Sequence, residues 1–123
     1  MEAEAKLYIQ EKVLSKQIEL AWSYMLDYEN EMNPFEERKR VIGRWKSRAI
    51  ADVEATPSIL RNTDKLRRRG VKSKDALHVA CAIVAGCDYF VTTDDLILGH
   101  AEDVGGIRIV DPPTLVREMT NDD

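Results

Sequence analysis

The stretch that decides the fold is GVKSKDALHVACAIVAGCDYFVTTDD, which runs from Gly70 to Asp95. Ser73 is suited to cap a helix and would place Asp75 in its first turn, and small or branched apolar residues then supply a buried face. Gly86 is suited to end that helix. The apolar, β-branched segment YFVTT (89–93) predicts a buried strand. We therefore expect a helix and then a strand, with acids where the helix begins and where the strand ends.

The rest of the chain continues this alternation of helices and short strands. We predict helices at 3–15, from Ser23 to the Asn33-Pro34 pair, at 34–50, at 57–69 with Gly70 closing it, and at 114–119. Strands are predicted at 18–23, 89–93 and 107–113, with a weaker candidate at 51–56. Helices that alternate with short apolar strands predict an α/β sandwich with a mainly parallel sheet. In such sheets, functional sites lie at the carboxyl ends of the strands.

Length and composition favour one globular domain. The chain has 123 residues, 44% of them hydrophobic, and a formal net charge of −4. No apolar run reaches the roughly 18 residues of a membrane helix, and the first residues lack the pattern of a secretory signal. Cys81 and Cys87 have no further metal-ligand partners at a zinc-site spacing. We expect a protein of the reducing cytoplasm with no membrane association.

Three acids are predicted to meet at one rim of the sheet. Glu29 follows the strand at 18–23, Asp75 begins a helix, and Asp94 follows the strand at 89–93. Clustered carboxylates repel one another unless a cation lies among them. A hard divalent ion such as Mg²⁺ or Mn²⁺ prefers oxygen ligands and suits phosphodiester hydrolysis by a metal-bound water.

Each acid also has a purely structural explanation. Asp75 in a first helical turn is favoured by the helix dipole. Glu29 is compatible with an exposed position on a helix, and the TTDD segment that contains Asp94 is compatible with a simple turn after a strand. His78 follows Asp75 by one turn, so it either hydrogen-bonds a site acid or is satisfied within its own helix.

Three segments resemble the PIN domain family of metal-dependent ribonucleases, many of which are toxins of toxin–antitoxin pairs. SYMLDYE resembles the segment that ends in the family's catalytic Glu, which is Glu29 here. KDALHVACAIVAGCDYFVTTD resembles the block with an Asp that opens a helix, here Asp75, and a strand ending in Thr-x-Asp, here Thr92 and Asp94. IRIVDPPTLV resembles the closing strand and last helix.

The resemblance implies a three-layer sandwich with a short, mainly parallel sheet. It also implies an endoribonuclease for single-stranded or loop RNA, with Mg²⁺ or Mn²⁺ held by Glu29, Asp75 and Asp94. Asp95 is the alternative to Asp94, and Thr92 would orient the neighbouring acid. An antitoxin protein is an expected partner.

One departure from the family lies at the beginning of the chain. The family starts with a hydrophobic central strand that ends in a fourth catalytic Asp, whereas this chain starts with a helix. We therefore expect residues 1–118 to form a single PIN-like domain without its first central strand, followed by a polar tail at 119–123. Either Met1 is an internal start, or the chain is a degenerate member of the family. In the second case, the gap in the sheet would be closed by a strand swapped from another chain, as in a homodimer, or by a rearranged sheet. Without the fourth ligand, nuclease activity should be weak or absent.

Two basic segments and several aromatic residues admit both a structural and a functional explanation. The bases of 38–48 and 65–70 lie at helix ends, where they favour the dipole, but they could also contact phosphates. Tyr24 and Trp45 could stack on bases, or pack against the core. Two other classes of function stay open: a non-catalytic α/β module that binds RNA or protein, and a flavodoxin-like phosphoacceptor domain, which the lack of a lysine partner and of a first-strand acid disfavours.

Overall fold

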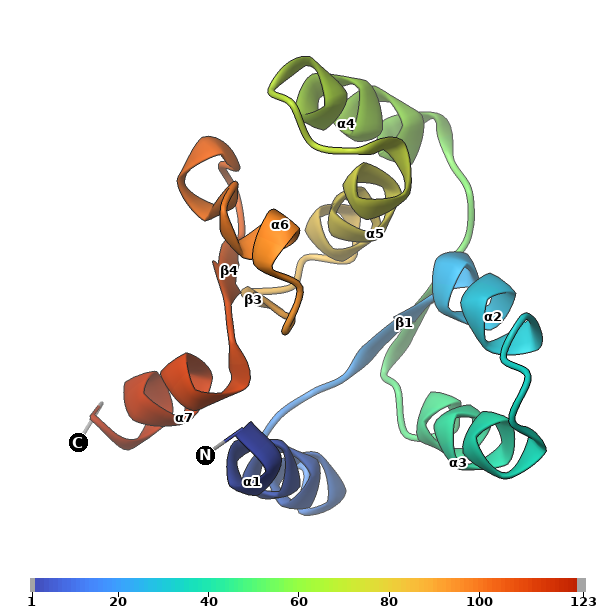
Figure 1. Cartoon of the computed structure of the whole chain (residues 1–123), viewed down its shortest axis with the longest axis vertical. Coiled ribbons are helices and arrows are strands. Elements are labelled where there is room, and N and C mark those ends of the chain that lie inside the picture. Colours follow the sequence, from blue (N-terminus) through green and yellow to red (C-terminus); the bar gives the residue numbers. More distant parts are fainter. Residues whose placement is uncertain (1, 122–123) are drawn as a thin grey trace.

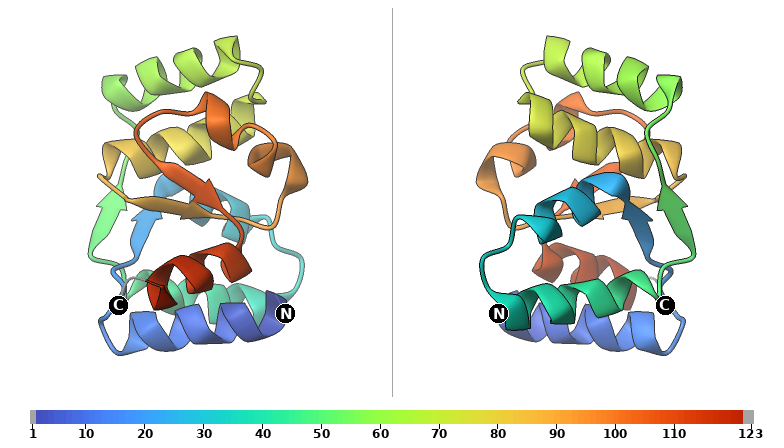
Figure 2. Two further views of the ribbon diagram at one scale, coloured as in Figure 1. Left: turned by 90° about the vertical axis from the view of Figure 1, so that its left-hand side faces the viewer. Right: turned by 90° about the vertical axis from the view of Figure 1, so that its right-hand side faces the viewer.

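The computed structural model describes residues 2–121 and contains helices on both sides of short parallel strands (Figures 1 and 2). The helices are α1 (Glu2–Leu14), α2 (Tyr24–Glu31), α3 (Glu36–Lys46), α4 (Pro57–Arg68), α5 (Ser73–Val84), α6 (Asp95–Leu98) and α7 (Pro112–Thr120), with a 3₁₀ turn, η1, at Ala101–Asp103. The strands are β1 (Ala21–Ser23), β2 (Ala51–Val53), β3 (Tyr89–Val91) and β4 (Arg108–Val110). The mixed α/β class predicted from the sequence is confirmed.

The strands form two separate pairs. β1 pairs with β2 and β3 pairs with β4, both in parallel, with Trp22 opposite Asp52 and Phe90 opposite Ile109. Helix α5 packs against both β1 and β3 and so links the two pairs. In Figure 2, α4 and α5 lie on one side of the strands, and α1, α3 and α7 lie on the other. In residues 2–121, the single sheet that we expected is present as two separate pairs of strands.

Local chemistry explains where two of the helices begin. The Thr56 hydroxyl accepts the backbone N–H of Ile59 at 3.3 Å, and Pro57 occupies the first position of α4. The Asp111 carboxylate accepts the N–H of Thr114 at 2.8 Å, and Pro112 opens α7 in the same way. These hydrogen bonds satisfy N–H groups that a helix cannot satisfy itself.

The core lies mainly between α4 and α5. The side chains of Ile59 and Val79 are almost fully buried, and the small residues Ala76, Ala80 and Cys81 let the two helices approach closely. Trp22 is also buried, and its indole N–H donates to the Asp27 carboxylate at 2.9 Å. Across residues 2–121, no helix is both long and apolar enough to cross a membrane.

Several boundaries differ from the sequence prediction. Each strand spans three residues, shorter than we expected, and α3 begins at Glu36, after Pro34. Lys72, not Ser73, occupies the cap position of α5. The short helix α6 was not predicted, and α7 continues to Thr120, beyond the expected helix end at Met119 and into the segment that we assigned to the tail. Asp122 and Asp123 lie outside the described residues.

Candidate functional site

Glu29 is held against α5 by two side chains. Its Oε1 lies 2.8 Å from Nε2 of His78, and its Oε2 accepts a hydrogen bond from Nζ of Lys74 at 3.0 Å. The His78 side chain is only 13% exposed, whereas that of Lys74 is 58% exposed. The hydrogen bond from Lys74 and the charge of Glu29 raise the pKa of Lys74 above its ordinary value. The contact from His78 to a predicted site acid is therefore present, and the contact from Lys74 is one that the sequence did not indicate.

Asp75 lies in the first turn of α5, as predicted, and its side chain is half-buried. Lys74 and His78, the two partners of Glu29, are its neighbours on that helix, one residue before it and three residues after it. Residues three or four apart on a helix share one face. The fold therefore brings Glu29 of α2 to the turn of α5 that carries Asp75.

Asp94 lies directly after β3 and takes part in a turn. Its Oδ1 accepts the N–H of Leu96 at 2.9 Å, which caps α6, and its own N–H donates to Oγ1 of Thr92 at 3.0 Å. The Thr92 hydroxyl thus contacts the backbone of Asp94. Asp95 is the first residue of α6, and both acids are exposed.

The predicted acids do not all converge. Within the part of the chain that the structure describes, no three His, Cys, Asp or Glu side chains lie close enough together to hold a metal ion. Glu29 follows β1 and Asp94 follows β3, and these strands belong to different pairs. Glu29 contacts Lys74 and His78 of α5, but Asp75, Asp94 and Asp95 do not complete a group of this kind with Glu29 and His78.

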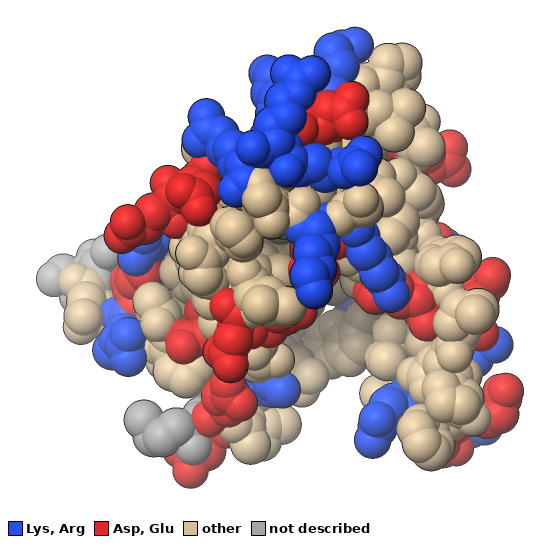
Figure 3. All heavy atoms as spheres, turned by 45° about the horizontal axis from the view of Figure 1, so that its top comes forward, with Lys and Arg blue, Asp and Glu red and all other residues tan. Residues whose placement is uncertain are grey.

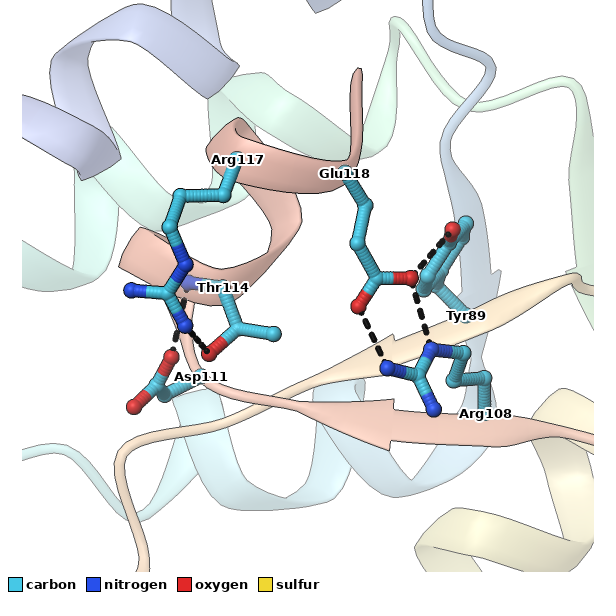
Figure 4. Close-up of polar contacts among 6 residues, drawn as sticks. All are labelled: Tyr89, Arg108, Asp111, Thr114, Arg117 and Glu118. Carbon is cyan, nitrogen blue, oxygen red and sulfur yellow. Dashed lines mark hydrogen bonds and ion pairs between the residues drawn. The ribbon is translucent and has the colours of Figure 1, made fainter. Parts of the chain in front are cut away.

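Two further polar clusters connect the strands to the surrounding helices. Asp27 accepts hydrogen bonds from Trp22 and from Lys46 at 3.1 Å, and these contacts hold its pKa below the usual range. Glu118 of α7 accepts two hydrogen bonds of 2.6 Å from Arg108 of β4, and one of 3.0 Å from the Tyr89 hydroxyl of β3 (Figure 4). Nothing in the sequence spacing pointed to either cluster, because each joins segments brought together only by the fold.

Basic side chains gather over α4. Its last turn carries Lys65, Arg67 and Arg68, and Figure 3 shows Lys and Arg concentrated at that end of the molecule. The three residues are exposed. Tyr24 and Trp45 are half-buried, which agrees with packing roles for both.

No protein-family model matches this chain, and no curated protein shows significant sequence similarity to it.

Proposed function

We propose that this chain is a PIN-like domain, a three-layer α/β sandwich that carries part of a Mg²⁺- or Mn²⁺-dependent ribonuclease site. Its substrate would be single-stranded or loop RNA in the cytoplasm, and an antitoxin protein would be its partner. As the chain stands, cleavage would be weak or absent.

The observation that carries the proposal is the contact of Glu29 with the first turn of α5. Lys74 and His78 both contact the carboxylate of Glu29, and Asp75 lies between these two residues in the sequence of α5. Neighbouring carboxylates are stabilised by a cation. Lys74 supplies positive charge here and is exposed enough to leave when a metal ion enters. A divalent cation bound by Glu29 would take over the positive charge that Lys74 supplies.

The residues present fit only part of a metal site. Glu29 and Asp75 would supply oxygen ligands of the kind that Mg²⁺ and Mn²⁺ prefer, but in residues 2–121 no three His, Cys, Asp or Glu side chains lie close enough together to hold an ion. A bound ion would supply an activated water for phosphodiester hydrolysis. The role of the chain's own residues would be to bind that ion through Glu29 and Asp75 and to hold Glu29 in place through His78. The incomplete ligand set is the reason that we expect little turnover.

The alternative is a non-catalytic module that binds RNA. The exposed bases at the end of α4 favour it, because phosphate contacts need only positive charge and no metal. Binding by such a surface would weaken steeply as salt is raised, and it would not respond to loss of Asp75.

A cleavage assay and a metal titration separate these two functions. The assay incubates the purified chain with labelled single-stranded RNA and Mn²⁺, alongside Asp75→Asn and Glu29→Gln, with Glu31→Gln on the same helix as the matched control. We expect the unaltered chain to cleave the RNA at a rate close to that of a control reaction that contains Mn²⁺ but no protein. Robust turnover that disappears in Asp75→Asn would show that the acids present suffice and would overturn the expected weakness.

The metal titration distinguishes the proposed metal site from the non-catalytic RNA-binding module. Mn²⁺ binding that is lost in Asp75→Asn, but kept in Glu31→Gln, supports the PIN-like site. RNA binding without any Mn²⁺ binding supports the non-catalytic module.

A further inference from the structure

Two aromatic side chains are exposed in the part of the chain that the structure describes, and both lie where α2 leads into α3. Tyr28 of α2 is 57% exposed and Phe35, which precedes α3, is 60% exposed, whereas the other aromatic residues of 2–121 are buried or half-buried. Met32, between them in the sequence, is 70% exposed. We call Tyr28, Met32 and Phe35 the α2–α3 row. Exposed apolar surface of this kind, bordered by polar residues, marks an interaction site.

The backbone holds the row in place. Met32 donates its N–H to the carbonyl of Tyr28 at 3.3 Å, and residues four apart share one face of a helix, so these two side chains lie on the same face. The side-chain oxygen of Asn33 accepts the N–H of Phe35 at 3.1 Å, which fixes the turn that follows α2. The three exposed side chains are therefore presented by a helix end and a hydrogen-bonded turn.

The row begins next to the candidate site. Tyr28 directly precedes Glu29, and its phenol is among the groups that raise the pKa of Lys74, after the hydrogen bond and the charge of Glu29. The Tyr28 ring thus lies near the Lys74 ammonium. An ammonium has three N–H donors and Glu29 accepts from one, so Lys74 can also donate to a phosphate oxygen.

The other end of the row carries a cation on a ring. The guanidinium carbon of Arg38 lies 5.2 Å from the centre of the Phe35 ring, over its face. Glu36 and Glu37 follow this ring in the first turn of α3, and their charge would repel a phosphate. This end of the row therefore suits a base better than a phosphate, because a base can stack on a ring or on a guanidinium plane.

The basic surface of α4 lacks what the row provides. Residues 57–88 contain no aromatic residue, so the surface of α4 can contact phosphates but offers no ring on which a base can stack. Proteins that bind single strands combine positive charge for the backbone with exposed rings for the bases. A protein-binding surface fits the row less well, because the cores of protein interfaces are depleted of charge and each ring here has a charged residue next to it.

We propose that the α2–α3 row is the platform on which bases of a single-stranded RNA stack, with Tyr28 placing one base beside the Glu29–Lys74 pair. Tyr28 would hold the strand in position and would take no part in breaking a bond. Lys74 would contact the phosphate next to that base, and Phe35 with Arg38 would receive a second base. The inference rests on the part of the proposed function in which single-stranded RNA is the ligand, and it does not depend on metal binding.

A short single-stranded RNA that carries a fluorescent adenine analogue tests the proposal, because the emission of the analogue falls when it stacks. The titration contains EDTA, so that the result does not depend on a metal ion. We expect a saturable fall in emission with the unaltered chain and with Asp75→Asn. No such fall with the unaltered chain would overturn the proposal, whereas failure to bind Mn²⁺ in the metal titration would overturn only the proposed metal site.

Three variants locate the stacking. Tyr28→Ala should weaken binding about tenfold, because it removes a ring on which a base stacks. Tyr28→Phe keeps the ring and should bind the RNA as the unaltered chain does. Leu7→Ala, at a residue of α1 that is 61% exposed, is the control and should leave binding unchanged. Equal effects of Tyr28→Ala and Leu7→Ala, or equal weakening by Tyr28→Phe and Tyr28→Ala, would contradict the role of the ring.

A strand of the same length without bases separates stacking from phosphate contacts. It should bind the unaltered chain about tenfold more weakly than the intact strand does, or weaker still, and Tyr28→Ala should not reduce its affinity further. Equal affinity of the chain for the two strands would show that phosphate contacts alone hold the RNA, and would overturn the proposal.

An NMR titration of the unaltered chain gives a result that does not depend on any variant folding correctly. The ring signals of Tyr28 and Phe35 should shift when the intact strand is added. Shifts confined to α4 would place the RNA on that surface alone and refute the row as its platform. Self-association of the chain that Tyr28→Ala abolishes, with no effect on RNA binding, would assign the row to a second copy and also overturn the proposal.

Discussion

Nε2 of His78 lies 2.8 Å from Oε1 of Glu29, so a largely buried side chain of α5 fixes an acid of α2. A hydrogen bond with a buried partner stabilises more than an exposed ion pair does. His78→Ala should therefore lower the free energy of unfolding by about 1–2 kcal/mol. Lys74→Ala, which removes the exposed partner of the same carboxylate, should leave it nearly unchanged. Urea denaturation measures the free energy of unfolding of both variants. Equal decreases in the two variants would contradict the larger contribution that we assign to His78.

The contact between α4 and α5 carries much of the core. Ile59 is fully buried, whereas Leu60, the next residue, is 56% exposed. Ile59→Ala should lower the free energy of unfolding by about 2–4 kcal/mol, because it removes buried methylene groups and leaves a cavity. Leu60→Ala should change it by less than about 0.5 kcal/mol. Thermal or urea unfolding of the pair checks this, and a small effect of Ile59→Ala would show that the two helices do not pack as described.

Replacement by alanine should change the free energy of unfolding in opposite directions at two glycines. Gly70 closes α4 with a φ of +97°, which strains any residue with a Cβ atom, so Gly70→Ala should destabilise by about 1–2 kcal/mol. Gly43 lies inside α3, where a Cβ atom would meet nothing closer than 3.8 Å, so Gly43→Ala should stabilise by about 0.5–1 kcal/mol. The same unfolding measurement applies to both, and a shared sign would refute one of the two backbone assignments.

The link between β4 and α7 should appear in the pH dependence of stability. The hydrogen bonds from Arg108, and then that from Tyr89, hold the pKa of Glu118 below its ordinary value of 4.5. A carboxyl whose folded pKa is depressed stabilises the fold above its unfolded pKa, and this contribution is lost as the pH falls through the folded value.

Glu118→Gln should therefore reduce stability at neutral pH and remove the part of the acid destabilisation that occurs below about pH 4.5. Unfolding experiments at neutral pH and at about pH 3 measure the difference in the free energy of unfolding between Glu118→Gln and the unaltered chain. Glu102→Gln, an exposed acid of η1, serves as the control. Parallel pH profiles for Glu118→Gln and the unaltered chain would contradict the assigned link.

The sequence predicted most accurately what local chemistry controls. The bounds of α4 are within one residue of the prediction, because Thr56 and Pro57 begin it and Gly70 ends it through their own backbone preferences. The predicted strands were too long. Each strand pairs with a single neighbour in the structure, and each spans three residues. Helix α6 was missed because Asp94 was taken as the end of a strand, whereas its carboxylate caps the next helix.

The candidate site was only partly predictable for a related reason. The position of Asp75 in a first helical turn follows from local sequence, and the structure places it there. The contacts of Glu29 do not follow from local sequence, because Lys74 and His78 reach this residue only after α2 and α5 have packed. Whether Asp94 joins them depends on the separation of β1 from β3, which no pattern in either strand encodes.

The most direct measurement of the proposed site is the paramagnetic broadening of amide NMR signals by Mn²⁺. Titration of the isotopically labelled chain should broaden the signals of Glu29, Lys74, Asp75 and His78 first, and Asp75→Asn should remove that effect while Glu31→Gln leaves it in place. Broadening centred elsewhere on the molecule, or no selective broadening at any Mn²⁺ concentration, would contradict a divalent-metal site at the contact of α2 with α5.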